Sequence, residues 1–156
     1  MKLTRRTVIY IFFGILLLLV VMNFMRTVQQ QAVVLTLPGG QQVMLEVADS
    51  PEERLLGLFF TETLPENRGM LFIFEDRDPR RVWTRGYRFP VDFLWLDNEF
   101  LVVNYEEGIS PCSTDPCPTY SPADGKAHYA IAISAGLIRQ QGLAKGHRLN
   151  LSHTAS

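Results

Sequence analysis

Residues 33–47 read Val-Val-Leu-Thr-Leu-Pro-Gly-Gly-Gln-Gln-Val-Met-Leu-Glu-Val. Two runs of apolar and β-branched residues, 33–37 and 42–47, flank a turn that contains Pro38-Gly39-Gly40. Such runs on either side of turn residues predict a β-hairpin. The folded part of the chain is therefore expected to open as sheet.

The following residues predict two short helices and more sheet. Ser50-Pro51-Glu52-Glu53 supplies a capping hydroxyl, a proline at the first helical position and two acids, which predicts a helix to about Gly57. Ser134 is expected to cap a second helix from Ala135 to about Gln141, ended by Gly142. Further strands are predicted over residues 70–74, 81–84, 91–96, 100–105, 128–133 and 148–151. The expected fold is mostly β, a small barrel-like sheet that carries two short helices.

A long loop is predicted over residues 106–126, because this segment holds four of the nine prolines and proline cannot donate to a ladder. The only two cysteines, Cys112 and Cys117, lie within it. An oxidising compartment favours a disulfide between them, whereas zinc would require further ligands nearby. A redox pair is the alternative, although its usual form is Cys-x-x-Cys at the start of a helix. We interpret the pair as a structural disulfide that stiffens the loop.

An uncharged, apolar run from Val8 to Met25 comes after Lys2, Arg5 and Arg6. Its eighteen residues extend for roughly 27 Å as a helix, close to the hydrocarbon thickness of a bilayer. The bias of basic residues would keep the N-terminus in the cytoplasm and place the remainder of the chain outside. The sequence therefore predicts an uncleaved anchor in the cytoplasmic (inner) membrane. A cleavable signal peptide is the alternative, but the run is long for one and no small-x-small site comes after it.

The expected organisation is a basic N-terminus over residues 1–7, a transmembrane anchor over 8–25, a short tether over 26–32 and an exported β-rich domain over 33–152. Four of the fifteen Lys and Arg residues lie in residues 1–26, which contain none of the sixteen Asp and Glu residues. The remainder therefore has a net charge of about −5 with neutral histidines. A nucleic-acid partner is not expected, because phosphate neutralisation needs a basic face.

A series of short motifs occurs in one order along this domain. They are Glu52-Glu53-Arg54-Leu55-Leu56-Gly57-Leu58, Arg68-Gly69-Met70-Leu71-Phe72-Ile73-Phe74, Trp83, Pro90-Val91-Asp92, Cys112, Cys117-Pro118-Thr119-Tyr120, Ala135-Gly136 and Lys145-Gly146. In order and spacing they resemble domain-of-unknown-function family 192, over nearly all of residues 33–151. The resemblance implies a mostly β domain of bacteria and archaea that is often exported, and it brings no established reaction.

The chain departs from the family pattern at polar positions. Family members commonly read Met-Lys-Asn-Thr after the tryptophan, whereas this chain has Thr84-Arg85-Gly86-Tyr87. Ala132 stands where the family strand often has glutamate, and His147 where aspartate is usual. Asp92 is the acid that this chain retains. These differences weaken the transfer of a shared polar site to this protein.

An arginine cluster is the first candidate binding feature. Arg77, Arg80, Arg81, Arg85 and Arg88 are interleaved with Trp83, Tyr87 and Phe89. Guanidinium groups bind carboxylates and phosphates, and aromatic faces stack on sugars, so wall fragments and lipid headgroups are suitable ligand classes. The alternative is a solvated strand edge paired with Glu75, Asp76 and Asp78. Trp83 taken alone is typical of a core residue.

Asp92 is the second candidate, because it interrupts the apolar run Val91-Asp92-Phe93-Leu94-Trp95-Leu96. A buried carboxylate needs a partner, and Arg85 is a candidate across a turn that contains Gly86. We therefore predict that Trp83, Arg85 and Asp92 line a small ligand site. A buried ion pair that fixes the turn is an equal alternative.

The sequence favours a binding module over an enzyme. His128, His147 and His153 are scattered without an acid at catalytic or metal spacing, and no phosphate loop or nucleophile motif is present, so no cofactor and no metal are expected. The leading hypothesis is an envelope module that binds an anionic or saccharide ligand, or a protein, near residues 83–92. One alternative is an enzyme acting on envelope material with Asp92 as acid or base. Another is an assembly protein whose contact surface is the 106–126 loop.

Overall fold

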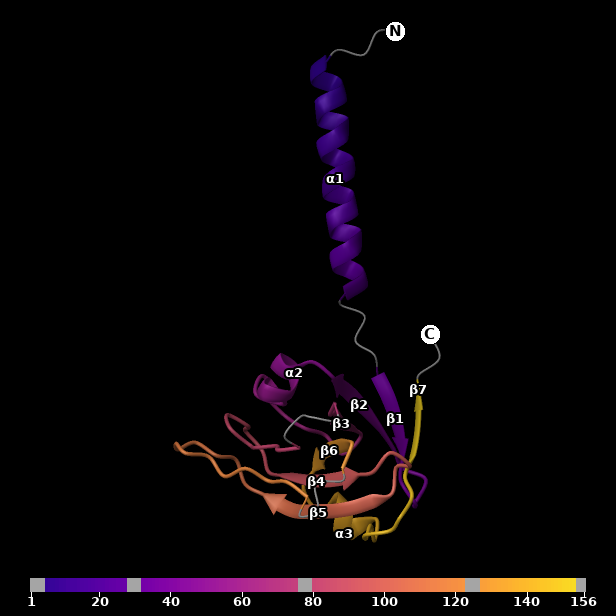
Figure 1. Ribbon diagram of the computed structural model, residues 1–156, viewed down its shortest axis with the longest axis vertical. Helices are drawn as coiled ribbons and strands as arrows, with labels where there is room; N and C mark the ends of the chain where they lie inside the picture. The colour runs from indigo at the N-terminus through magenta and orange to yellow at the C-terminus, as the bar shows by residue number, and fades with distance from the viewer. Residues whose placement is uncertain (1–4, 28–31, 76–79, 123–126, 154–156) are drawn as a thin grey trace. The chain divides into compact units, whose positions relative to one another are not determined.

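The chain divides into two units, residues 1–30 and 31–156, and each is described by itself. The structure is a computed structural model that describes residues 5–27, 32–75, 80–122 and 127–153 (Figure 1). In the first of these ranges, side chains are described at Arg6 and over residues 10–22. The second unit carries the strands, the remaining helices and the candidate sites.

The N-terminal unit contains helix α1, Arg5–Thr27. Among the residues that the structure describes, no helix combines the length and apolar character needed for a membrane span. This finding corrects the expectation of a transmembrane anchor over residues 8–25.

The predicted hairpin and first helix are confirmed. Strands β1, Ala32–Thr36, and β2, Gln42–Ala48, pair in antiparallel fashion around the Pro-Gly-Gly turn. Helix α2, Pro51–Leu56, begins with a capping box in which the Glu53 amide donates to Ser50 Oγ at 3.2 Å and the Ser50 amide donates to Glu53 Oε2 at 3.1 Å. These hydrogen bonds lower the pKa of the Glu53 carboxyl.

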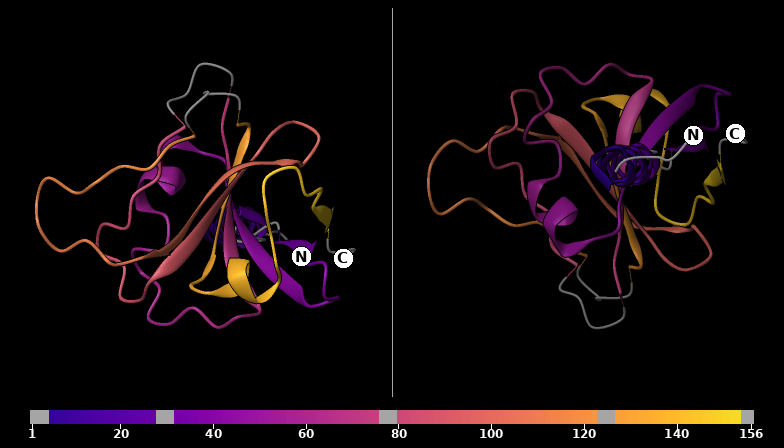
Figure 2. Two further views of the ribbon diagram at one scale, coloured as in Figure 1. Left: turned by 90° about the horizontal axis from the view of Figure 1, so that it is seen from below. Right: turned by 90° about the horizontal axis from the view of Figure 1, so that it is seen from above.

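The described strands form one sheet in the order β5-β4-β6-β3-β2-β1-β7, in which only the β2 and β3 neighbours are parallel. The later elements are β3 Arg68–Ile73, β4 Val91–Leu96, β5 Val102–Ile109, β6 Tyr129–Ser134, α3 Leu137–Gln140 and β7 Asn150–His153. The sheet curls into a half-barrel (Figures 1 and 2). Its two edges meet near Leu101 and Arg148, where Val102 N donates to His147 O at 2.9 Å and Leu149 N donates to Phe100 O at 3.0 Å.

Several predicted boundaries are wrong. Residues 81–84 form no strand of the sheet, and only isolated bridges occur there, at Val82 and Arg85. Strand β5 continues to Ile109, so residues 106–109 of the predicted loop belong to the sheet. Helix α3 is shorter than predicted and lacks a side-chain cap from Ser134, because its N-cap residue is Gly136. Residues 110–122 then project from the half-barrel as an extended loop (Figure 2).

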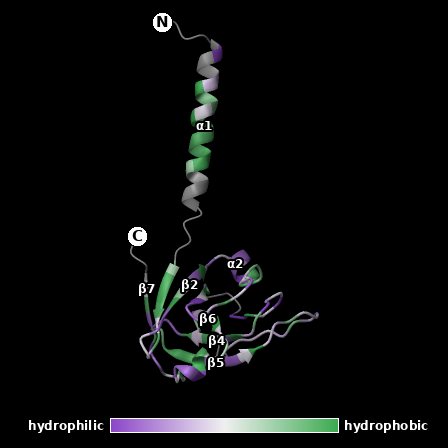
Figure 3. Cartoon of the chain, turned by 180° about the vertical axis from the view of Figure 1, so that it is seen from behind, coloured by the Kyte–Doolittle hydropathy of each residue, from purple (hydrophilic) through white to green (hydrophobic). Residues whose placement is uncertain are grey.

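Side chains that alternate along the strands build two cores, one on each face of the sheet. On β4, Leu94 and Leu96 join the cluster inside the half-barrel, whereas Phe93 and Trp95 join the cluster on its outer face. Figure 3 shows that helix α2 is largely hydrophilic, in contrast to the hydrophobic strand β1. Strands β3 and β6 approach so closely that a Cβ on Gly69 would lie 2.5 Å from the carbonyl oxygen of Ala132.

Tyr87 belongs to the outer cluster and is only 5% exposed. Burial raises the pKa of its hydroxyl from 10.0 to about 12, although a hydrogen bond with the Leu58 backbone acts in the opposite direction. The unfolded chain therefore releases this proton first. The stability that this raised pKa contributes is fully present below about pH 10. The free energy of unfolding should fall by about 2–3 kcal/mol as the pH rises from 10 to 12.

Urea unfolding between pH 9 and pH 12 measures this effect. A Tyr87→Phe variant should lose stability at neutral pH and show a shallower alkaline fall than the unmodified chain. An equal fall in both proteins would show that the Tyr87 hydroxyl is not responsible.

Candidate functional site

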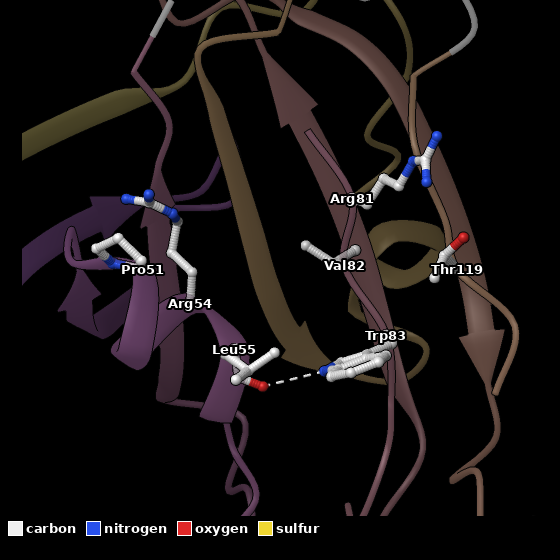
Figure 4. A pocket seen from close by; sticks show the side chains of 7 residues that line it. All are labelled: Pro51, Arg54, Leu55, Arg81, Val82, Trp83 and Thr119. Atoms are coloured by element: carbon white, nitrogen blue, oxygen red, sulfur yellow. Dashed lines mark hydrogen bonds between the residues drawn. The ribbon is translucent and has the colours of Figure 1, made fainter. Parts of the chain in front are cut away.

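Trp83 lies half-buried beside α2 and belongs to neither buried cluster, so its interpretation as a core residue is wrong. Its indole Nε1 donates to the carbonyl oxygen of Leu55 at 3.1 Å. A cavity of about 290 Å³ opens next to the ring. Figure 4 shows its two walls, Pro51, Arg54 and Leu55 from α2 on one side and Arg81, Val82, Trp83 and Thr119 on the other.

Backbone pairing brings the second wall together. Val82 N donates to Tyr120 O at 2.9 Å, and Tyr120 N donates to Val82 O at 2.8 Å, so Thr119 arrives beside residues 81–83. The other arm of the loop is fixed by Cys112 N, which donates to Thr84 O at 3.1 Å. The loop thus clamps the Trp83 segment from both arms.

Two arginines, Arg54 and Arg81, line this cavity from opposite walls. Arg54 is held in place, because its Nη1 donates to the carbonyl oxygens of Asp49 at 2.5 Å and Ile73 at 2.8 Å. Arg81 is exposed, and within the described part of the chain it forms no ion pair. The cavity therefore combines an aromatic wall with one fixed and one available cation.

Arg85 connects Trp83 to the disulfide loop. Its guanidinium carbon lies 5.7 Å from the centroid of the Trp83 ring, and its Nη2 donates to Asp115 Oδ2 at 2.8 Å. Asp115 lies between Cys112 and Cys117, which form the predicted disulfide with a Cα–Cα distance of 5.8 Å. A second cavity of about 200 Å³ lies here, lined by Phe59, Arg85, Gly86, Cys112, Ser113, Thr114, Asp115 and Cys117.

The described members of the predicted arginine cluster do not gather around one cavity. Arg80 Nε donates to the Ala127 carbonyl oxygen, and Arg88 pairs with Glu62. Arg77 lies outside the described residues, as do Asp76 and Asp78, the partners expected from the neighbouring sequence. Of the four described arginines, Arg81 lines the first cavity and Arg85 the second.

Asp92 is separate from both cavities. It is fully buried, and its carboxylate accepts three backbone hydrogen bonds, from Gly108 N to Oδ1 at 2.7 Å and from Gly136 N and Ile138 N to Oδ2 at 2.8 and 3.1 Å. The predicted pairing with Arg85 is therefore wrong, because backbone amides are the partners. The structure brings Trp83 and Arg85 together and places Asp92 at the first turn of α3.

Sequence reasoning missed the wall formed by α2 and the contribution of Thr119. Leu55, at the end of α2, and Phe60, just after it, are 59% and 75% exposed. Exposed apolar side chains of this kind indicate an interaction surface next to α2. Thr119 gave no local signal, since the pairing of Tyr120 with Val82 places it. Among the residues that the structure describes, no group of His, Cys, Asp or Glu could hold a metal ion.

Comparison with known proteins identifies the class. Residues 33–151, which form the half-barrel and the segment that carries Trp83, match the model of domain-of-unknown-function family 192, described as "Uncharacterized ACR". The chain belongs to this family. No curated protein matches it.

Two solved structures share the fold. One is a protein of unknown function from Novosphingobium aromaticivorans, with a TM-score of 0.64, 24% identity, and coverage of 76% of this chain and 83% of that chain. The other is a proposed transcription regulator from Sinorhizobium meliloti, with a TM-score of 0.64, 22% identity, and coverage of 80% and 93%. At these identities the similarity concerns the fold alone.

The structure shows the surroundings of two positions, Gly86 and Ala132, at which the sequence departs from the expected pattern. Ala132 is fully buried in the outer cluster on β6, among apolar neighbours. Gly86 has a φ of +72°, and a Cβ there would lie 2.3 Å from ring carbons of Phe59. In this chain the Phe59 ring therefore occupies space that a side chain at position 86 would need.

Replacing Asp92 should destabilise the domain. Asp92→Ala leaves three backbone donors without their acceptor, and we expect a loss of about 3 kcal/mol in the free energy of unfolding. Asp92→Asn retains one oxygen and should lose less. Urea unfolding gives both values.

The matched control is Asp115→Ala, which removes a carboxylate from an exposed ion pair and should cost less than about 1 kcal/mol. If the Asp92→Asn domain were as stable as the unmodified chain but no longer bound the ligands named below, Asp92 would belong to a binding site and its role as a buried hydrogen-bond acceptor would be contradicted.

Proposed function

We propose that this domain is a binding module, and that the cavity between α2 and Trp83 takes a small anionic ligand of the cell envelope. The ligand class is a phosphate or carboxylate attached to a sugar or another compact group with an apolar face. The observation that supports this proposal is that one aromatic residue, Trp83, and two arginines, Arg54 and Arg81, line the same cavity of about 290 Å³.

The geometry favours recognition by charge and stacking. The indole of Trp83 is held by Leu55, so it offers an ordered surface against which a sugar ring can pack. Arg81 supplies an exposed cation, and guanidinium groups form paired hydrogen bonds with phosphate and carboxylate oxygens. Arg54 adds positive charge from a fixed position on the opposite wall.

The enzyme alternative has less support. Asp92, its expected acid or base, is fully buried and has both oxygens engaged by backbone amides. A general acid or base must reach the substrate directly or through one water molecule. Asp92 lines neither of the cavities next to Trp83 and Arg85.

A protein partner is the second candidate, and the shape of the 110–122 loop favours it. The loop projects from the half-barrel (Figure 2), and its tip residues Ser113, Thr114, Asp115 and Pro116 are exposed. The disulfide beneath this tip restricts its conformations, which lowers the entropy lost when a partner binds.

The ligand proposal is tested by isothermal titration of the full chain with glycerol 3-phosphate and N-acetylmuramic acid. Glycerol and N-acetylglucosamine are the matched uncharged probes. We expect saturable binding of at least one anionic probe and at least tenfold weaker binding by Arg81→Ala, because charged hydrogen bonds are worth about 1.5–3 kcal/mol. Trp83→Phe should weaken binding while retaining an aromatic ring.

Arg139→Ala is the control, because this arginine is exposed on α3 and lines neither cavity near Trp83. Equal affinity of Arg81→Ala and the unmodified chain would contradict the proposal. Absence of binding by every anionic probe would favour the loop as a surface for a protein partner.

We also propose that the domain works outside the cytoplasm. The disulfide between Cys112 and Cys117 supports this, since such bonds persist in oxidising compartments. The basic N-terminus and the apolar run after it agree with export, whether or not the segment is later removed.

Thiol trapping in intact cells tests the compartment. Alkylation before and after reduction should show both cysteines oxidised, and free thiols in freshly treated cells would contradict export. In the purified chain, replacing both cysteines with serine should lower the free energy of unfolding by about 2 kcal/mol, the chain-entropy value for so short a loop.

A further inference from the structure

A separate cavity opens on the inner face of the half-barrel. Its volume is about 290 Å³. The lining comes from strands β1, β2, β3, β6 and β7 and from the turn before β5. Its principal lining residues are Val33, Leu71, Ile73, Phe100, Tyr129 and Leu151. This region shares no lining residue with the cavity beside Trp83.

The inner face is incompletely filled at this point. Small barrels are usually filled by their own inward-facing side chains. Here Ile73, Phe100, Tyr129 and Leu151 pack against the inner cluster but remain only partly buried around the cavity. Their apolar surface is available to an occupant that excludes water.

The chemistry of the lining selects an uncharged occupant. None of the described lining residues is Asp, Glu, Lys, Arg or His. A charged group placed there would lose hydration without gaining a partner of opposite charge. The lining residues Tyr129 and Ser152 carry hydroxyl groups, which suits a ligand with one neutral polar group.

The backbone of Phe100 is a second unusual feature of this region. Its φ is +61°, a left-handed conformation that costs free energy for a residue with a bulky side chain. The turn is fixed by Asp97 Oδ1, which accepts hydrogen bonds from Glu99 N and Leu101 N at 2.9 Å each. This conformation places the Phe100 ring against Tyr129, with 5.0 Å between ring centroids and an interplanar angle of 30°.

We propose that this cavity binds one small neutral apolar molecule, which packs against the Phe100 and Tyr129 rings and against Leu71 and Leu151. An apolar cavity of about 150 Å³ holds benzene, so the larger volume here suits a fused pair of rings or an alkyl chain of about ten carbons. The ligand is a small molecule, since the volume and the uncharged lining match one compact group.

The test is a titration of the full chain, monitored by methyl NMR, with 2-naphthol as the neutral probe and 2-naphthoate as its charged counterpart. We expect saturable shifts at the methyl groups of Leu71, Ile73 and Leu151, with unchanged methyl groups at Leu55. The dissociation constant for 2-naphthoate, measured at these same three residues, should be at least tenfold higher. This comparison uses the unmodified protein, so it does not depend on whether a variant folds.

A Leu151→Trp variant fills the cavity and should weaken 2-naphthol binding at least tenfold, whereas the control Leu55→Trp, beside Trp83, should leave the affinity unchanged. Circular dichroism verifies that both variants fold. The proposal is overturned if the lining methyl groups show no saturable shift up to the solubility of the probe. It is also overturned if the shifts caused by 2-naphthol centre on Leu55, or if 2-naphthoate shifts the methyl groups of Leu71, Ile73 and Leu151 with the same affinity as 2-naphthol.

Discussion

The buried carboxylate of Asp92 holds three parts of the domain together. It lies on β4, and its oxygens accept hydrogen bonds from Gly108 on β5 and from Gly136 and Ile138 at the start of α3. The amides at the first turn of a helix lack partners within the helix, so a carboxylate placed there both satisfies them and interacts favourably with the helix dipole. Because α3 supplies Leu137 and Ile138 to the inner core, this arrangement also fixes one end of the half-barrel.

The outer side of the sheet depends on a different constraint, the clamp formed by the disulfide loop. One arm pairs with Thr84 and Gly86 and the other with Val82, so the segment that carries Trp83 is ordered without joining the sheet. Asp115 on the loop fixes Arg85, and Arg85 packs on Trp83. The surface proposed to bind an anion therefore depends on contacts between residues about 30 positions apart.

Two cavities of similar volume lie in regions of opposite chemistry. The one beside Trp83 has an arginine on each wall, whereas the described lining on the inner face has no charged side chain. A single ligand type would not suit both, since a charged group gains partners in the first and loses hydration in the second. The family and its solved relatives supply the fold but no reaction, so these two chemistries give the most specific indication of function.

The sequence by itself determined the family, the mostly β fold, the opening hairpin, the capped helix α2 and the disulfide, because each depends on local periodicity, capping residues or compartment. It also indicated that Asp92 needs a partner, but it assigned Arg85 instead of three backbone amides. Only the tertiary structure decided that the 81–84 segment stays outside the sheet and that Arg85 pairs with Asp115. Residues in these contacts lie far apart along the chain, and local sequence carries little information about which distant backbone groups a side chain will meet after the sheet curls.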